Sequence, residues 1–247
     1  MPFIYNYEFD CVSDIGKMRD SNEDSLLCLN IKNYSNNLFA NSVLLGVADG
    51  VGGGPAGEIA SKVALESFRK KLFELVSDFQ GDKENSIVID ALRQAVQHAN
   101  AEVTASSIGN AKYAGMATTL TAAYLTGSRS FIGHVGDSRC YLIRAGRIRQ
   151  LTIDHGQGNM LRHALGVSLP PPHQMCQEIL LENNDTILVC SDGLSNMLQD
   201  QTIADIIVHA PNSAEACSKL AETANANGGA DNISIAMARV TVRFVQR

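Results

Sequence analysis

The stretch Leu44-Leu45-Gly46-Val47-Ala48-Asp49-Gly50-Val51-Gly52-Gly53-Gly54 decides how the rest of the chain is interpreted. Its apolar first half predicts a buried strand over residues 44–48. Asp49 stands at the end of that strand, and four of the five residues at 50–54 are glycine. Glycine lets the backbone come close to whatever the carboxylate holds. An acid at this position therefore indicates a metal or phosphate site, and the remaining sequence has to decide between the two.

The composition is that of an ordinary globular protein. The chain has 247 residues, of which 45% are hydrophobic and 19% are charged. A chain of this length buries roughly 70% of its unfolded surface and needs no disulfides. A net charge of −6 and a pI near 5.5 argue against a nucleic-acid partner, since such proteins carry a basic surface. We expect a single domain over residues 1–247.

The sequence has no segment with the features of a signal peptide or of a membrane-spanning helix. The first residues lack the basic start and apolar centre of a signal peptide. No apolar run approaches the ~20 residues that cross a bilayer. The six cysteines form no C-x-x-C pair, and several stand in apolar runs, as free thiols do in a reducing compartment. The expectation is a cytoplasmic protein without membrane contact.

Hydrophobic periodicity outlines the order of the elements. Strands are predicted at 3–15, 25–29, 43–48, 118–125, 129–135, 139–144, 147–150, 175–181, 186–190 and 233–242. Helices are predicted from about Pro55, at 85–106, at 195–209 and at 213–226, and a hairpin loop at 33–41. The four strands of 118–150 have tight links, which predicts an antiparallel meander. Together these elements predict an α+β fold, with two sheets sandwiched between helical layers.

Acids recur where the apolar strands begin or end. They are Glu23, Asp24, Asp49, Asp137, Asp192 and Asp231. A single acid at such a position is usually a turn residue, but acids at five separate points, with Glu23 and Asp24 forming one of them, suggest one shared site. Clustered carboxylates repel and raise one another's pKa unless a cation holds them. Oxygen ligands suit Mg²⁺ or Mn²⁺, whereas zinc would require His or Cys at characteristic spacing.

Two divalent cations about 4 Å apart would explain the pattern chemically. They can share a bridging water and lower its pKa, and the resulting hydroxide can attack phosphorus in line. Such a site needs a cationic side chain that grips the phosphate oxygens in a bidentate manner. Arg19, four residues before Glu23, is the candidate for that contact.

The glycine loop has a competing interpretation. Residues 52–57 match the G-x-G-x-x-G pattern and follow a predicted strand, as in dinucleotide-binding folds. That fold requires a second strand with an acid about 20 residues further on. Here residues 72–76 belong to a predicted helix instead. The loop also lacks the Gly-Lys-Ser/Thr of a P-loop and the alternating acids of an EF-hand, so the cation interpretation is favoured.

Seven short motifs in a fixed order resemble one known family. They are Arg-Asp-Ser-Asn-Glu-Asp (19–24), Val-Ala-Asp-Gly-Val-Gly-Gly (47–53), Ala-Thr-Thr-Leu (117–120), Gly-His-Val-Gly-Asp-Ser-Arg (133–139), Thr-Ile-Asp-His (152–155), Cys-Ser-Asp-Gly-Leu (190–194) and Asp-Asn-Ile-Ser (231–234). Their sequence resembles the PPM-type, metal-dependent serine/threonine protein phosphatases, also called the protein phosphatase 2C family. The resemblance extends over roughly residues 8–242.

The resemblance implies a four-layer α-β-β-α sandwich, two mainly antiparallel sheets flanked by helix pairs, with two Mn²⁺ or Mg²⁺ ions at one end. It implies that Asp49 bridges both metals and that Gly50 offers its carbonyl to one of them. Asp192 and Asp231 would be ligands of the other metal. Further roles are implied for Glu23 and Asp24, through coordinated water, for Asp137, at a third and weaker metal, for Arg19, on phosphate, and for Thr118 and Thr119, as support of the site.

The chain departs from the family pattern at three places. Val51 stands where many eukaryotic members have a histidine that protonates the leaving group, so a metal-bound water would have to supply that proton. Ala117 replaces a glycine. Only residues 156–162 precede His163-Ala164-Leu165-Gly166, where bacterial members carry a helical flap of some twenty residues before Arg-Ala-Leu-Gly. The flap is therefore shortened.

The resulting hypothesis is a protein serine/threonine phosphatase, a phosphoric monoester hydrolase of cytoplasmic signalling. It would hydrolyse phosphoserine and phosphothreonine by attack of a dimetal-bound hydroxide, without a covalent phosphoenzyme. Its partners would be phosphorylated proteins and a cognate Ser/Thr kinase, and it would act as a monomer. Two alternatives stay open: a pseudophosphatase scaffold, which should have lost metal carboxylates, and another metal-dependent phosphoesterase such as a nuclease, which should have a basic groove.

Overall fold

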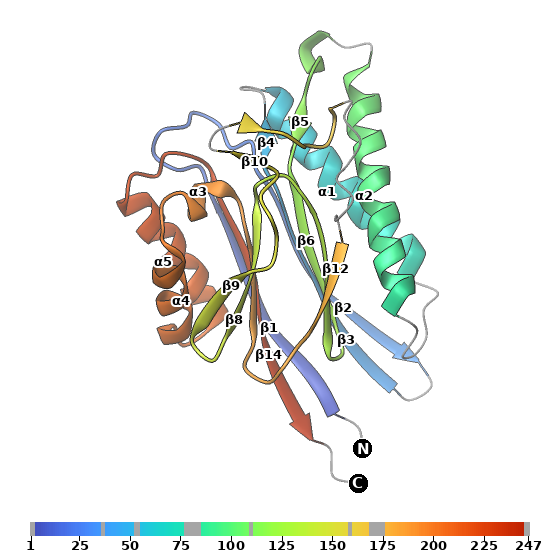
Figure 1. Cartoon of the computed structure of the whole chain (residues 1–247), viewed down its shortest axis with the longest axis vertical. Coiled ribbons are helices and arrows are strands. Elements are labelled where there is room, and N and C mark those ends of the chain that lie inside the picture. Colours follow the sequence, from blue (N-terminus) through green and yellow to red (C-terminus); the bar gives the residue numbers. More distant parts are fainter. Residues whose placement is uncertain are drawn as a thin grey trace.

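The computed structural model describes residues 3–35, 38–51, 55–76, 85–108, 111–157, 160–167 and 176–244. Two five-stranded sheets face each other, and helices cover the outer face of each (Figure 1). The β1 sheet has the order β1 (Phe3–Asp14), β14 (Ile233–Phe244), β13 (Thr186–Cys190), β8 (Arg139–Arg144) and β9 (Arg147–Gln150). The β2 sheet has the order β12 (Cys176–Leu180), β7 (Arg129–Val135), β6 (Leu120–Thr126), β3 (Leu38–Ala48) and β2 (Ser25–Ser35).

The helices form the two outer layers. α1 (Pro55–Val76) and α2 (Asn85–Ser107) cover the β2 sheet, while α4 (Asp200–His209) and α5 (Ser213–Ala226) cover the β1 sheet (Figure 1). Short elements occupy the connections: β4 (Gly50–Val51), a 3₁₀ turn (Ala111–Tyr113), β5 (Ala117–Thr118), β10 (Gly156–Gln157), β11 (Met160–Leu161) and α3 (Asp192–Ser195). All ladders between named strands are antiparallel, so the predicted α-β-β-α sandwich is confirmed.

The central strands are continuous apolar runs because both of their faces are buried. In β3, Val43, Leu45 and Val47 pack into the core between the sheets, while Leu44 and Ala48 pack under α1 and α2. The same alternation holds in β13. Successive side chains of a strand point to opposite faces, so one apolar run supplies two cores.

Three predictions about local structure were wrong in part. The expected hairpin loop at 33–41 is mostly strand, since β2 and β3 stay paired to Ser35↔Leu38. The expected meander is two hairpins on different sheets, because the chain crosses from β7 to β8 through residues 136–138. The expected helix at 195–209 is α3 followed by α4, with non-helical residues between them. Residues 52–54 and 168–175 lie outside the described part of the chain.

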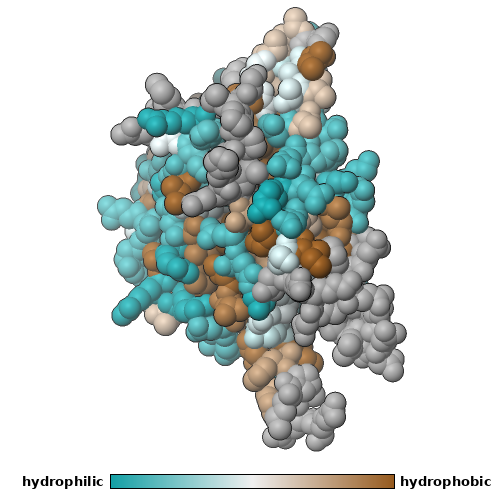
Figure 2. Space-filling model, turned by 45° about the vertical axis from the view of Figure 1, so that its right-hand side comes forward, coloured by the Kyte–Doolittle hydropathy of each residue, from teal (hydrophilic) through white to brown (hydrophobic). Residues whose placement is uncertain are grey.

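The first and last strands pair along their whole length, from Phe3↔Phe244 to Asp14↔Ile233. The start of β1 and the end of β14 therefore lie side by side at the lower end of the molecule (Figure 1). On the face shown in Figure 2, hydrophobic residues are scattered among hydrophilic ones. None of the described helices is long and apolar enough to cross a bilayer.

Candidate active site

The strand registers bring the predicted acids to one end of the sandwich. Asp49 follows β3, and residues 23–24 precede β2, whose start pairs with the end of β3 through Ser25↔Ala48. Asp192 follows β13, and Asp231 precedes β14, whose start pairs with the end of β13 through Cys190↔Ile235. Asp137 lies between β7 and β8. In an antiparallel pair the end of one strand meets the start of the next, so these acids share one edge.

The backbone of Asp49 is held by two threonines of the β5–β6 junction. The Asp49 N–H donates to Thr119 Oγ1 at 2.9 Å. The Asp49 carbonyl accepts from the Thr119 N–H at 2.9 Å and from Thr118 Oγ1 at 2.8 Å. Gly50 pairs with Thr118 in the β4–β5 ladder. Thr118 and Thr119 therefore hold the backbone of this corner by hydrogen bonding.

Asn232 ties the N-terminal part of the site to the C-terminal part. Its side chain is buried, with 4% exposed. Its Oδ1 accepts from the Glu23 N–H at 2.8 Å, and its Nδ2 donates to the carbonyls of Ile15 at 2.8 Å and Ser21 at 2.9 Å. One amide thereby positions the segment 15–24, which carries Arg19, beside the start of β14.

Two glycines allow the N-terminus of α1 to approach Glu23. A Cβ on Gly57 would lie 2.2 Å from Glu23 Oε2, and a Cβ on Gly50 would lie 2.3 Å from the Gly57 carbonyl oxygen. A side chain at Gly50 would force the backbone of Gly57 to move, and a side chain at Gly57 would displace the carboxylate of Glu23. The glycines that make room for the acids are therefore Gly50 and Gly57, whereas Gly52, Gly53 and Gly54, to which we assigned that role, lie outside the described residues.

Arg19 forms an ion pair across the site. Its Nη2 lies 2.6 Å from Asp231 Oδ2, and the side chains are 48% and 30% exposed. The pair joins residues 212 positions apart. The hydrogen bond to Asp231 raises the pKa of Arg19, with Glu23 and Asp49 acting in the same direction from further away. The exposed guanidinium thus already faces the acids.

The aspartates raise one another's pKa. Burial, followed by the charge of Asp24, Asp192, Asp231 and Asp137, raises the pKa of Asp49 well above its ordinary value. Burial raises the pKa of Asp24 to about 7, against hydrogen bonds that lower it, among them that from Ser191 Oγ at 2.8 Å. Burial and neighbouring acids raise the pKa of Asp192 to about 6, and burial first raises that of Asp137. Such mutual perturbation is typical of a functional site.

The free carboxylate oxygens fit divalent cations. Oδ1 of Asp24 and Oδ1 of Asp192 are buried and have no hydrogen-bond partner. A buried acceptor without a partner is costly, and a hard cation that prefers oxygen ligands would satisfy it. Within the described residues, the side chains do not form a closed group of three or more potential ligands around one point. The oxygen donors nevertheless suit Mn²⁺ or Mg²⁺, because two buried carboxylate oxygens have no other partner. Asp231 is neutralised by its ion pair with Arg19.

The positions that depart from the family pattern lie in or next to the short strands β4, β5, β10 and β11. Val51 pairs with Ala117 in the β4–β5 ladder, and its side chain is 40% exposed. The rings of His163 and His155 meet edge-on, with centroids 5.7 Å apart. The backbone N–H of His163 donates to the His155 carbonyl at 3.3 Å. The shortened connection is a small β10–β11 hairpin whose residues 158–159 are not described. The ring of His134 is buried and hydrogen-bonded to Thr121 Oγ1 at 2.8 Å.

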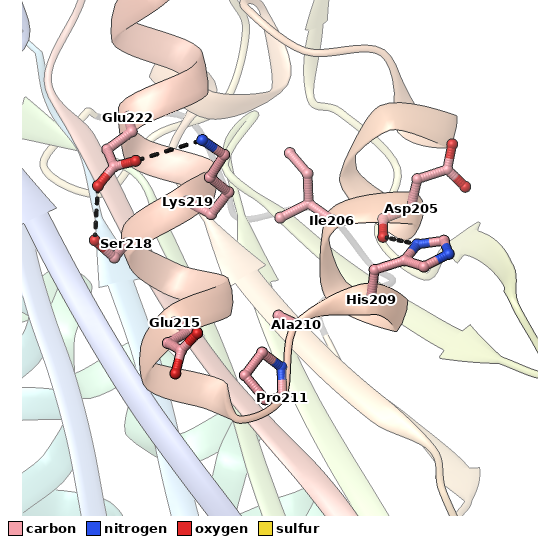
Figure 3. A pocket seen from close by; sticks show the side chains of 9 residues that line it. All are labelled: Asp205, Ile206, His209, Ala210, Pro211, Glu215, Ser218, Lys219 and Glu222. Atoms are coloured by element: carbon pink, nitrogen blue, oxygen red, sulfur yellow. Dashed lines mark hydrogen bonds and ion pairs between the residues drawn. The ribbon is translucent and has the colours of Figure 1, made fainter.

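A surface hollow lies elsewhere, between α4 and α5 (Figure 3). It has a volume of about 550 Å³, and none of the six acids discussed above lines it. Its charged groups are satisfied internally: Glu222 accepts from Ser218 at 3.2 Å and pairs with Lys219 at 3.6 Å, while His209 Nδ1 donates to the Asp205 carbonyl at 2.7 Å. The chemistry therefore belongs to the acidic edge and not to this hollow.

Sequence reasoning missed the roles of Asn232 and Gly57. Asn232 belongs to the motif 231–234, but nothing local shows that its amide reaches residues 15–23. Gly57 appeared only as the last glycine of the competing G-x-G-x-x-G pattern. The only sequence feature that pointed to such roles is that glycine or asparagine directly follows several of the acids, as Asn232 follows Asp231.

The chain is similar in sequence to known protein phosphatases. The family model for protein phosphatase 2C matches residues 22–234. The serine/threonine protein phosphatase PstP of Mycobacterium tuberculosis is 31% identical over 249 residues, which cover 92% of this chain and 44% of PstP. This chain therefore spans less than half of that relative. The serine/threonine phosphatase stp of Listeria welshimeri is also 31% identical over 249 residues, covering 90% of this chain and 92% of stp.

Solved structures of similar proteins share the sandwich. The catalytic domain of PstP in complex with two manganese ions has a TM-score of 0.78 and 31% identity, over 96% of this chain and 100% of that one. A bacterial serine phosphatase has a TM-score of 0.80 and 26% identity, over 97% and 100% of the two chains. The likeness therefore extends over nearly the whole chain.

Proposed function

Since this chain belongs to the protein phosphatase 2C family, we propose that it is a metal-dependent protein serine/threonine phosphatase that hydrolyses phosphoserine and phosphothreonine. One observation carries the proposal: aspartates from four separate chain segments share one edge, and their mutual repulsion and burial raise their pKa values. A carboxylate cluster of this kind is stable in its charged form only with cations among it.

The proposed ligand set follows the acids of this edge. Asp49 would bridge two Mn²⁺ or Mg²⁺ ions, and the Gly50 carbonyl would bind one of them. Asp192 and Asp231 would hold the other, with Glu23 and Asp24 acting through water and Asp137 at a third, weaker site. The orphaned oxygens of Asp24 and Asp192 support these assignments. When bound, the metals lower the pKa of a water and screen the charge of the phosphate.

The chain itself would orient the substrate. Arg19 is half-exposed and paired with Asp231, so its guanidinium can exchange that carboxylate for the oxygens of a phosphoryl group. Asn232 and the two threonines keep the segments that carry Arg19 and Asp49 in register. Val51 has no titratable group, so the proton for the leaving alkoxide comes from water and not from the residue after Gly50.

The same proposal extends to the biological setting. We place residues 1–247 in one domain, because β1 and β14, from opposite ends of the chain, pair within one sheet. Phosphorylated proteins and a cognate Ser/Thr kinase would be its partners, since a kinase makes the substrate that this chemistry removes. We propose a monomer that acts in cytoplasmic signalling.

The test is Mn²⁺-dependent release of phosphate from a phosphothreonine peptide. We expect activity with Mn²⁺, none with a chelator, and a loss of at least about 10³-fold in Asp192→Asn, because the substitution removes a charged metal ligand. Asp205→Asn, on α4 and away from the edge, is the matched control and should keep full activity. An inactive wild type would favour a scaffold. Cleavage of nucleic acid but not of the peptide would favour another phosphoesterase.

A further inference from the structure

Two cysteines lie on edge strands at either side of the segment that carries Arg19. Cys11 is in β1 and Cys28 is in β2, and each strand is the outermost strand of its sheet. Cys11 is paired with Ala236, and Cys28 is paired with Leu45. Both partners belong to the core between the sheets, and both cysteines pack against that core. The two thiols therefore face each other across the open edge of the sandwich.

The two thiols lie close to each other. β1 and β2 are in contact, and the interaction between Cys11 and Cys28 is the largest influence on the pKa of each thiol. Both residues are half-buried, so a small oxidant can reach them. By contrast, Cys140 and Cys190 are fully buried and lie on opposite faces of the β1 sheet. The 11–28 pair thus differs from Cys140 and Cys190 in both contact and access.

The interaction also makes the two thiols differ in reactivity, because it shifts their pKa values in opposite directions. The interaction with Cys28 lowers the pKa of Cys11 to about 7, although burial and the charge of Asp10 act in the opposite direction. The same contact, together with burial and the nearby Cys217, raises the pKa of Cys28. The thiolate is the nucleophilic form of cysteine, so Cys11 is the thiol that meets an oxidant first.

We propose that Cys11 and Cys28 form a reversible disulfide when a hydroperoxide oxidises the protein, and that this disulfide lowers its phosphatase activity. The Cys11 thiolate attacks the outer peroxide oxygen and the O–O bond breaks, which gives a sulfenic acid and releases hydroxide from hydrogen peroxide or an alkoxide from an organic hydroperoxide. The Cys28 sulfur then attacks the Cys11 sulfur and forms the S–S bond, while the sulfenic oxygen leaves as water with the Cys28 proton. Two electrons pass from the two thiols to the peroxide.

The disulfide closes a covalent ring around residues of the site. The ring runs from Cys11 to Cys28 and contains Arg19, Glu23 and Asp24. An S–S bond is about 2.0 Å long, whereas two sulfurs in non-bonded contact lie roughly 3.5–4 Å apart, so the two side chains must move closer and pull on β1 and β2. A displacement of about 1 Å near reacting groups can cost up to ~10²-fold in rate. This effect on activity rests on the proposed function, while formation of the disulfide does not.

The experiment uses the whole reduced chain. The metal-free protein is treated with hydrogen peroxide, the remaining thiols are alkylated with N-ethylmaleimide, and the unreduced digest is mapped by mass spectrometry. We expect a peptide pair joined through Cys11 and Cys28, and two fewer alkylated cysteines than in the reduced protein. Cys11→Ser and Cys28→Ser should abolish the cross-link. Cys176→Ser, at another half-buried thiol, is the matched control and should retain it.

Activity is then measured after Mn²⁺ is restored. We expect kcat/KM of the oxidised wild type to fall by about tenfold and to recover with dithiothreitol, and that of peroxide-treated Cys28→Ser to stay unchanged. Absence of the cross-link would overturn the proposal. A cross-link with unchanged kcat/KM would overturn its regulatory half. A reduced wild type without activity would refute the proposed function instead, because the peptide map still reports on the cysteines.

Discussion

Replacement of Asn232 by alanine should destabilise the protein and impair its site at the same time. The buried side chain makes three hydrogen bonds, to the Glu23 N–H at 2.8 Å and to the carbonyls of Ile15 at 2.8 Å and Ser21 at 2.9 Å. Alanine leaves all three partners without the amide. At about 1 kcal/mol for each bond, the expected loss in the free energy of unfolding is about 3 kcal/mol. For a chain of this size the thermal midpoint should fall by roughly 6–12 °C.

Two assays measure the prediction. Urea unfolding followed by circular dichroism gives the free energy of unfolding, and phosphate release from a phosphothreonine peptide gives kcat/KM. We expect kcat/KM to fall at least tenfold, since the segment that carries Arg19 and Glu23 loses its attachment to β14. Asn227→Ala is the matched control: its exposed amide makes one hydrogen bond, to the Met197 carbonyl at 3.0 Å. It should cost less than about 1 kcal/mol.

Asn232→Asp sharpens the test. It keeps the shape and the acceptor for the Glu23 N–H but turns an oxygen toward two carbonyls. We expect it to be at least as destabilising as alanine, because the buried oxygens then face one another without a donor. The reasoning would be refuted if Asn232→Ala unfolded within about 1 kcal/mol of the wild type and kept its kcat/KM.

Three further predictions follow from the same edge. Gly57→Ala should lower kcat/KM by about tenfold or more, because the new Cβ would lie 2.2 Å from Glu23 Oε2. Thr119→Val should cost about 1–3 kcal/mol of unfolding free energy, because the Asp49 N–H loses its 2.9 Å acceptor. The metal-free protein should lose thermal stability between about pH 4 and pH 7, because the folded state raises the pKa of Asp24 to about 7 and so binds its proton more tightly than the unfolded chain does.

Each of these has a control or a contrary outcome. Gly133→Ala, whose Cβ would make only ordinary contacts with Leu92 and Val96 from 3.4 Å, should be tolerated. Thr119→Ser keeps the hydroxyl and should restore most of the loss seen with valine. For the pH series, Mn²⁺ should raise the thermal midpoint more at pH 7 than at pH 4, because more of the acids are charged at pH 7. A metal-free protein whose midpoint rises from pH 4 to pH 7 would contradict the proposed coupling of the acids.

Local patterns predicted those elements that have clear boundaries. The strands at 129–135, 139–144 and 147–150 and the helix at 213–226 have the expected limits, since turn residues or a cap stand at their ends. The same signals cannot show which sheet a strand joins, so the crossing between β7 and β8 looked like the turn of a meander. The polar residues of 33–41 indicated a loop, but an edge strand tolerates polar side chains because one side of its backbone faces solvent.

Sequence alone determined the chemical character of this protein. Residue types at strand ends, acids beside glycine or asparagine, are local features, and they sufficed to predict a divalent-cation site that includes Asp49. Only the tertiary structure decided which groups meet. Arg19 reaches Asp231 across 212 positions, Asn232 holds Glu23 across 209, and Cys11 faces Cys28 across the edge of two sheets. The reason is physical: periodicity records which face a residue occupies, whereas register and sheet stacking, set by the packing of the whole core, determine its neighbours.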